Sequence, residues 1–188
     1  LVSWTRTGAG WHGEGAQQVK PLTGLEADWL AMCRGLGDYV NKNGFPGIVI
    51  GMSGGIDSAI SAAIAVDALG PDKVWAVMMP SKYTSEESLE DARDCARRLG
   101  IRYDIIDVEP AIASFGQVLA PAFAGTEPDA SEENIQSRAR GVVLMALSNK
   151  FGPMVLSTGN KSEMAVGYAT LYGDMNGGYN ALKDIYKT

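Results

Sequence analysis

The segment SGGIDS at positions 53–58 stands directly after a short apolar run and directly before an alanine-rich stretch. The apolar run at 47–52 is rich in β-branched residues and is typical of a strand buried inside a parallel sheet. The stretch at 57–69 predicts a helix. A helix start presents unpaired N–H groups and the positive end of the helix dipole, which together favour an anion. The two glycines allow the anion to approach closely, and Ser53 and Ser58 add hydroxyl donors. The segment therefore predicts a phosphate site.

The carboxylate of Asp57 lies inside this predicted phosphate loop. Because like charges repel, an acid beside a phosphate is best explained by a divalent cation that bridges the two. The alternative is an ordinary strand-to-helix turn with Asp57 as a cap, but a plain cap does not call for two glycines between two serines. The segment matches neither GxxxxGK[ST] nor GxGxxG, so it does not support a Walker-type or dinucleotide-fold loop.

Strand and helix patterns alternate along the chain. Helix patterns occupy residues 24–39, 57–69, 85–99 and about 131–151, and strand patterns occupy 47–52, 73–79, 102–108 and 153–158. Each crossover helix must cover one face of the sheet, so the alternation predicts a three-layer, doubly wound α/β fold with a parallel sheet. Ligands then gather at the carboxyl ends of the strands, where SGGIDS, MPSKYTS and STGNKSE stand. The polar break GTEPDASEE at 125–133 predicts a mobile loop.

Composition narrows the class of partner. The net charge of -6 and the isoelectric point near 4.8 give no basic field, so we expect small substrates rather than nucleic acid. With 46% hydrophobic residues among 188, the chain can form one sizeable core. No apolar run approaches the roughly 20 residues of a membrane span, and Cys33 and Cys95 form no CxxC pair. We expect a soluble, cytoplasmic protein with two reduced thiols and no membrane partner.

The segment SGGIDS resembles the pyrophosphate loop of the N-type ATP pyrophosphatases. Similar loops occur in GMP synthetase, asparagine synthetase, argininosuccinate synthetase and tRNA-modifying enzymes, so the loop alone names no substrate. The later segments narrow the choice: MMPSKYTSEESLEDA, ENIQSRAR, LSTGNKSEMAVGYATLYGDMNGG and KDIYKT are together similar to the NAD synthetases of the glutamine-dependent type. The resemblance covers about residues 24–188 and implies an adenine nucleotide alpha hydrolase-like fold.

The resemblance implies a ligase reaction. Deamido-NAD, ATP and ammonia give NAD, AMP and pyrophosphate through an adenylated nicotinate carboxylate, with Mg²⁺ as cofactor. Glutamine-dependent relatives carry an upstream amidase domain with a Glu-Lys-Cys triad, which this chain lacks. We expect residues 1–21, which read as strand and turn, to be the tail of that domain or a linker, and 22–188 to be a synthetase domain truncated at its C-terminal end. The family also implies a homo-oligomer built on a dimer.

Residue roles follow by similarity. The resemblance assigns Thr158 to the nucleotide, the backbone near Met79 to adenine, and Lys187 to the ATP phosphates. Asp57 and Glu163 match magnesium ligands, and with Lys187 they form the expected catalytic set. The ATP-phosphate contacts are Gly51, Met52, Ser53, Gly54, Gly55, Ile56, Asp57 and Ser58. The deamido-NAD contacts are Asn134, Arg138, Glu163 and Asp174.

Each motif residue also has a structural interpretation. Arg138 and Arg140 can form a solvated helix face. Glu163 can occupy the first turn of a helix, where the dipole favours it. Lys161 can be a surface lysine, and His12, the one histidine, lies outside every motif and receives no catalytic role.

The sequence departs from the ammonia-dependent relatives at two positions, and two alternative functions stay open. Ammonia-dependent relatives carry lysine at Leu171 and aspartate at Gly178, which favours the glutamine-dependent branch. One rival is another amidating or thiolating pyrophosphatase, with GMP synthetase the nearest. The other is a non-catalytic nucleotide-binding module. Release of pyrophosphate that depends on deamido-NAD separates the three functions.

Overall fold

The computed structural model describes residues 2–15 and 21–187. Leu1 and residues 16–20, which belong to the predicted tail or linker, lie outside the described residues, as does Thr188 at the end of the predicted synthetase domain. No helix in the described part of the chain is long and apolar enough to cross a membrane.

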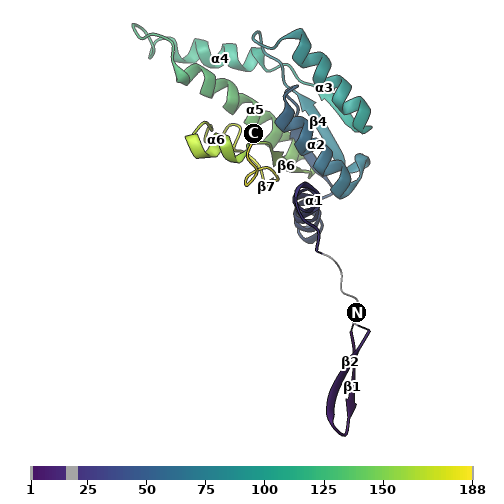
Figure 1. The fold of residues 1–188 in the computed structure, drawn as a ribbon. Helices are drawn as coiled ribbons and strands as arrows, with labels where there is room; N and C mark the ends of the chain where they lie inside the picture. The colour runs from purple at the N-terminus through teal and green to yellow at the C-terminus, as the bar shows by residue number, and fades with distance from the viewer. Residues whose placement is uncertain (1, 16–20, 188) are drawn as a thin grey trace.

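A five-stranded parallel sheet forms the centre of the molecule (Figure 1). Its order is β5-β4-β3-β6-β7. The central strand β3 pairs with both neighbours, and Ile48 lies opposite Val74 on β4 and Met154 on β6. The strands are β3 (Ile48–Gly51), β4 (Val74–Met78), β5 (Arg102–Ile105), β6 (Met154–Ser157) and β7 (Tyr179–Asn180). The parallel pairing therefore brings the carboxyl ends of β3, β4 and β6 to the same edge.

Helices cover both faces of the sheet (Figure 1). Side chains alternate along β3: Ile48 and Ile50 pack on one face and Val49 on the other. The first face is covered by α1 (Leu25–Lys42), α2 (Ile56–Leu69) and α3 (Glu86–Leu99). The second face is covered by α4 (Glu109–Leu119) and α5 (Ala130–Phe151). The predicted three-layer, doubly wound α/β fold is confirmed.

Three shorter elements complete the chain. A 3-10 turn at Pro71–Lys73 leads into β4, and α6 (Lys161–Val166) follows β6. The strands β1 (Ser3–Thr7) and β2 (Gly10–Glu14) form an antiparallel hairpin whose residues are all exposed. The predicted strand and turn in this stretch are confirmed.

Some predicted boundaries were wrong. The strand predicted at 102–108 ends at Ile105, because Asp107 accepts a hydrogen bond from the N–H of Glu109 (2.9 Å) and α4 begins there. Helix α4 and strand β7 were not predicted. The loop predicted at 125–133 ends at Asp129, which caps α5 in a reciprocal capping box with Glu132. The spacing of Asp129 and Glu132 is a recognised helix-start signal.

Candidate active site

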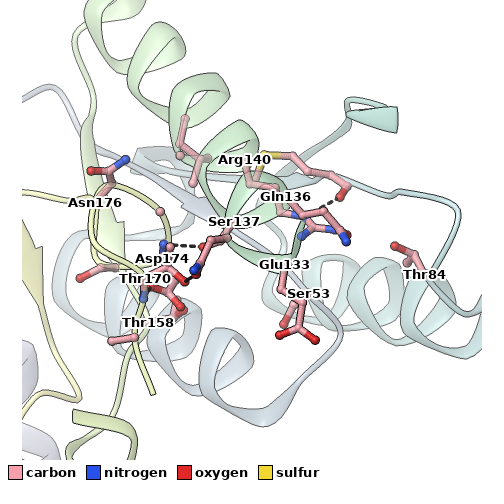
Figure 2. A pocket seen from close by; sticks show the side chains of 18 of the residues that line it. Ser53, Thr84, Glu133, Gln136, Ser137, Arg140, Thr158, Thr170, Asp174 and Asn176 are labelled. Atoms are coloured by element: carbon pink, nitrogen blue, oxygen red, sulfur yellow. Dashed lines mark hydrogen bonds between the residues drawn. The ribbon is translucent and has the colours of Figure 1, made fainter. Parts of the chain in front are cut away.

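A cavity of about 1090 Å³ opens where β3, β4 and β6 end (Figure 2). Its lining comes from the end of β3, the turn after β4, the start of α3, one side of α5 and the segment 167–176. The predicted site residues that line it are Gly51, Met52, Ser53, Met79, Asn134, Thr158 and Asp174. Segments far apart in the sequence thus meet at one hollow, as the strand order predicts.

The phosphate loop lies at the edge of this cavity and folds back on itself. The hydroxyl of Ser58 accepts from the N–H of Ser53 (3.2 Å) and donates to the carbonyl of Gly55 (3.0 Å). The hydroxyl of Ser53 accepts from the N–H of Gly55 (3.2 Å). Gly54 has φ of 81°, and a Cβ there would lie 2.5 Å from the carbonyl oxygen of Ser88 on α3. The loop therefore requires glycine at position 54.

The start of α2 is open to an anion. Its N-cap is Gly55, which has no side chain to satisfy the first N–H groups of the helix. The alternative in which Asp57 caps α2 is wrong, because its two carboxylate oxygens accept hydrogen bonds from Asn160 and Lys187 instead. Gly54, Gly55 and Ile56 line a second hollow of about 500 Å³ between α2 and α3.

Asn160 joins the two carboxylates that the sequence assigns to magnesium. Its amide nitrogen donates to Asp57 Oδ1 (3.2 Å), and its amide oxygen accepts from the N–H of Glu163 (3.0 Å). Glu163 Oε2 in turn accepts from the N–H of Asn160 (3.1 Å). Glu163 thus occupies the first turn of α6, as its structural interpretation expects, and also lies beside the Asp57 cluster. The amide is buried, with 2% of Asn160 exposed, so this junction is fixed.

Lys187, near the C-terminal end of the chain, lies against Asp57. Its ammonium donates to Asp57 Oδ2 (2.7 Å), and its N–H donates to the hydroxyl of Ser162 (3.1 Å). The hydrogen bond and charge of Asp57, with a smaller contribution from Glu163, raise the pKa of Lys187. Lys161 belongs to the same contact, because its N–H donates to the carbonyl of Ile185 (2.9 Å). The phosphate loop, α6 and the 185–187 segment therefore meet at Asp57.

Helix α5 holds the segment 167–176 by its polar side chains. Asn134 Oδ1 accepts from the Thr170 hydroxyl (2.9 Å), and the Ser137 hydroxyl accepts from the N–H of Asp174 (2.9 Å). Asp174 also accepts from the N–H of Thr170 (2.7 Å). Figure 2 shows Ser137, Thr170 and Asp174 grouped on one side of the cavity. Asn134 and Asp174, both predicted to meet deamido-NAD, are thus structurally linked through Thr170.

Arg138 and Gly141 also contribute to the contact between α5 and the segment 167–176. The guanidinium of Arg138 donates to the carbonyl of Leu171 (3.2 Å), but Arg138 is exposed and does not line the cavity. A Cβ at Gly141 would lie 3.0 Å from the carbonyl oxygen of Tyr172, so the absence of a side chain lets the segment approach the helix. Tyr172 itself has a left-handed φ of 63°. The tight packing at Gly141 adjoins this unusual backbone.

Arg140 is the main residue that the site assignment missed. The solvated-face interpretation is wrong for it: Arg140 is half-buried, lines the cavity and donates to the carbonyl of Met79 (3.1 Å) and the hydroxyl of Ser81 (3.3 Å). The exposure of Arg138 agrees with that interpretation. The spacing of the two arginines places them on different sides of α5, which a helical projection of the sequence reveals.

Three other predicted features have a clear place. The ammonium of Lys161 lies 4.7 Å from the centre of the Tyr186 ring, so this lysine packs on the 185–187 segment. His12 lies on β2, away from the cavity lining. A Cβ at Gly178 would lie 2.8 Å from Met154, so this packing has no room for an aspartate there.

The sequence of the chain is similar to those of known proteins. A family model described as NAD synthase matches residues 28–188. A glutamine-dependent NAD(+) synthetase of Rhodobacter capsulatus is 58% identical over 187 residues, which are 100% of this chain and 34% of that protein. The chain thus spans about a third of the length of this relative.

Solved structures give the same result. A glutamine-dependent NAD+ synthetase from Acinetobacter baumannii in complex with ADP matches with a TM-score of 0.88 and 52% identity, over 92% of this chain and 33% of that one. An NH3-dependent NAD synthetase from Campylobacter jejuni matches with a TM-score of 0.80 and 30% identity, over 88% of this chain and 69% of that one.

The packing at Gly141 makes a testable prediction. Gly141→Ala places a methyl group against the backbone of Tyr172 and Gly173, so we expect a loss of about 1–3 kcal/mol in the free energy of unfolding, measured by urea denaturation. Gly116→Ala on α4 is the matched control, since a Cβ there meets nothing within 4 Å. It should leave stability unchanged or raise it by about 1 kcal/mol. Equal stability of the two variants would contradict the close approach of segment 167–176 to α5.

Proposed function

This chain belongs to the NAD synthase family, and on that premise we propose that it is the synthetase part of a glutamine-dependent NAD synthetase. It amidates deamido-NAD to NAD and converts ATP to AMP and pyrophosphate. The observation that carries the proposal is the meeting, around one cavity, of the phosphate-loop residue Ser53 with Thr158, Asn134 and Asp174. These residues come from segments that the parallel sheet brings to one edge.

The nucleotide binds at the ends of β3, β4 and β6. Residues 51–58 hold the ATP phosphates, because the open start of α2 supplies N–H donors and a favourable dipole. Thr158 and Met79 both line the cavity. We assign Thr158 to the nucleotide and the backbone of Met79 to adenine. The ADP complex of the Acinetobacter baumannii relative supports nucleotide binding by this chain.

Asp57 and Glu163 are suited to Mg²⁺. Among residues 2–15 and 21–187, no group of three or more His, Cys, Asp or Glu side chains is placed to hold a metal ion. Two carboxylates nevertheless suffice, because Mg²⁺ is commonly bound by one or two carboxylates together with substrate phosphates and waters. The buried Asn160 amide joins Asp57 to the start of α6, where Glu163 stands. When bound, Mg²⁺ neutralises charge on the phosphates.

The protein's own contribution to the reaction is position and charge. The loop holds the β- and γ-phosphates while a carboxylate oxygen of deamido-NAD attacks the α-phosphorus and pyrophosphate leaves. The ammonium of Lys187 counters the charge of the departing phosphates. Ammonia then attacks the acyl carbon, AMP leaves with the bonding electrons, and the amide nitrogen loses a proton. The cavity walls limit hydrolysis of the adenylate by water.

Deamido-NAD occupies the side of the cavity formed by α5 and the segment 167–176. Asn134 and Asp174 line this side. Glu163 does not line the cavity and lies beside the Asp57 cluster, bonded to Asn160. Arg138 lies on the outer side of α5 with Val142 and Met145, which are 63% and 37% exposed. We place a dimer partner on this outer side, because a partly apolar helix face gains stability when it is covered. Arg138 then contacts deamido-NAD at the edge of a dimer.

The remainder of the parent enzyme supplies ammonia. The chain spans 34% of its Rhodobacter capsulatus relative, which leaves room for an amidase domain elsewhere in that protein. We assign residues 1–21 to the tail of that domain or a linker, and 22–188 to the synthetase domain. The cytoplasmic location stays a prediction supported by the unpaired state of Cys33 and Cys95.

The test of this function is pyrophosphate release by the parent protein with ATP, Mg²⁺ and ammonia. We expect release only when deamido-NAD is added, and Asp57→Asn should lower kcat by about 10²-fold or more. Asp72→Asn, at an exposed position before β4, is the matched control and should keep wild-type turnover. Turnover with xanthosine monophosphate would instead indicate a GMP synthetase. ATP binding without turnover would indicate a nucleotide-binding module.

Lys187 generates a second prediction. Lys187→Met removes a positive charge from the phosphates, so single-turnover pyrophosphate release at saturating ATP should slow by about 10-fold to 10²-fold. The affinity for deamido-NAD should change little, because Asn134 and Asp174 line the cavity and Lys187 does not. Lys183→Met, exposed in the same terminal segment, serves as the control. An unchanged rate in the Lys187 variant would mean that this ammonium only pairs with Asp57.

A further inference from the structure

Arg140 is a half-buried cation that faces the cavity (Figure 2). Of the described residues that line the cavity, it is the one with a basic side chain. Burial alone lowers the pKa of its guanidinium below the ordinary value, since no neighbouring carboxylate contributes. An arginine kept in such a place without an acidic partner loses hydration, and protein acceptors must replace the lost water.

The guanidinium donates two hydrogen bonds to the turn that follows β4. Nε donates to the carbonyl of Met79 (3.1 Å) and Nη2 donates to the hydroxyl of Ser81 (3.3 Å). Ser81 is itself buried, and its hydroxyl donates to Gln136 Oε1 on α5 (3.4 Å). Arg140 and Gln136, one turn apart on α5, therefore both bind the turn 79–81.

The rest of this turn is fixed from the other side. The N–H of Val108 donates to the carbonyl of Pro80 (3.1 Å), and the N–H of Ser81 donates to the hydroxyl of Thr84 (3.0 Å). The carbonyl of Met78 accepts from the N–H of Ile106 (2.8 Å). Of the three carbonyls from Met78 to Pro80, the Met79 carbonyl is the one that Arg140 orients. The ring of Pro80 fixes φ at that residue and limits rotation of the Met79–Pro80 peptide. Loss of the guanidinium therefore lets the Met79 carbonyl tilt through ψ of Met79, while its neighbours stay anchored to the β5 side.

We propose that Arg140 is a positioning residue that makes the site selective for a 6-amino purine by orienting the Met79 carbonyl and the turn 79–81. The proposal rests on the proposed function, which places adenine against this backbone. A carbonyl has two lone pairs and can accept from Arg140 and from the adenine amino group together. A 6-oxo purine presents an acceptor where adenine presents a donor, and a fixed carbonyl rejects it because two acceptors face each other.

The alternative role for Arg140 is direct attraction of the ATP phosphates. The geometry favours orientation of the turn, because both Nε and Nη2 already bind protein oxygens and the phosphate loop lies at another strand end. The two roles differ in what they recognise: a phosphate contact acts on every nucleotide alike, whereas an oriented carbonyl distinguishes bases. Selectivity between ATP and GTP therefore separates them.

The experiment compares Arg140→Met, Arg140→Lys and Ser81→Ala in the full-length parent protein. The measured quantity is the ratio of kcat/KM for ATP to that for GTP, with ATP, GTP and pyrophosphate binding measured by calorimetry. We expect both Arg140 variants to lower the ratio by about tenfold or more, through GTP acceptance and a higher KM for ATP. Ser81→Ala should lower it less, and pyrophosphate affinity should stay unchanged. Arg34→Met, an exposed arginine on α1, is the control.

Several outcomes overturn the proposal. Equal weakening of ATP, GTP and pyrophosphate by Arg140→Met, with recovery in Arg140→Lys, would make Arg140 a phosphate contact. A lowered melting temperature with an unchanged ratio would make it structural, and a wild-type protein that accepts GTP equally would remove the selectivity itself. If Arg140→Met fails to fold, Arg140→Lys and Ser81→Ala decide. If wild type shows no turnover dependent on deamido-NAD, the proposed function fails, and the ATP-to-GTP binding ratio still tests Arg140.

Discussion

The central position of β3 between β4 and β6 is the constraint on which the site depends. Because all three strands are parallel and in register, their carboxyl ends lie together, and each end continues into a polar segment. The three segments carry Ser53, Met79 and Thr158. A change in strand order would separate them, whereas a change in the helices would leave them adjacent. Hydrophobic pairing inside the sheet thus determines where the polar chemistry is located.

Much of this arrangement follows from local sequence signals. Apolar runs and alanine-rich stretches identified the strands and helices that form the layers, and the strand alternation predicted the edge at which ligands gather. Two elements lacked such signals. Strand β7 has two residues and exists through its pairing with β6, and α4 follows β5 so closely that Asp104 and Asp107 were included in one predicted strand. Short elements defined by tertiary pairing have no periodicity to detect.

The site assignment had a similar limit. Residues recognised by motif, such as Asp57 and Asn134, need only their sequence neighbours to be noticed. Asn160 and Arg140 act through partners far away in the chain, Asp57 and Met79, so their importance depends on contacts that only the fold creates. Helical spacing separates Arg140 from Arg138, but it does not say which side of α5 faces the cavity. That choice is made by the apolar contacts of α5 with the sheet.

The charges around the cavity determine which groups can bind a triphosphate. Glu132, Glu133 and Asp174 line the cavity, and Arg140, their one basic counterpart among the described lining residues, is bonded to the turn after β4. The walls therefore repel an anion more than they attract it. Binding must depend on the uncapped start of α2 and on the cluster at Asp57, where an ammonium and two carboxylates meet. Lys187 bonds to Asp57, where we propose the cation. On that proposal, binding of ATP with Mg²⁺ requires this ammonium to move from the carboxylate toward the phosphates.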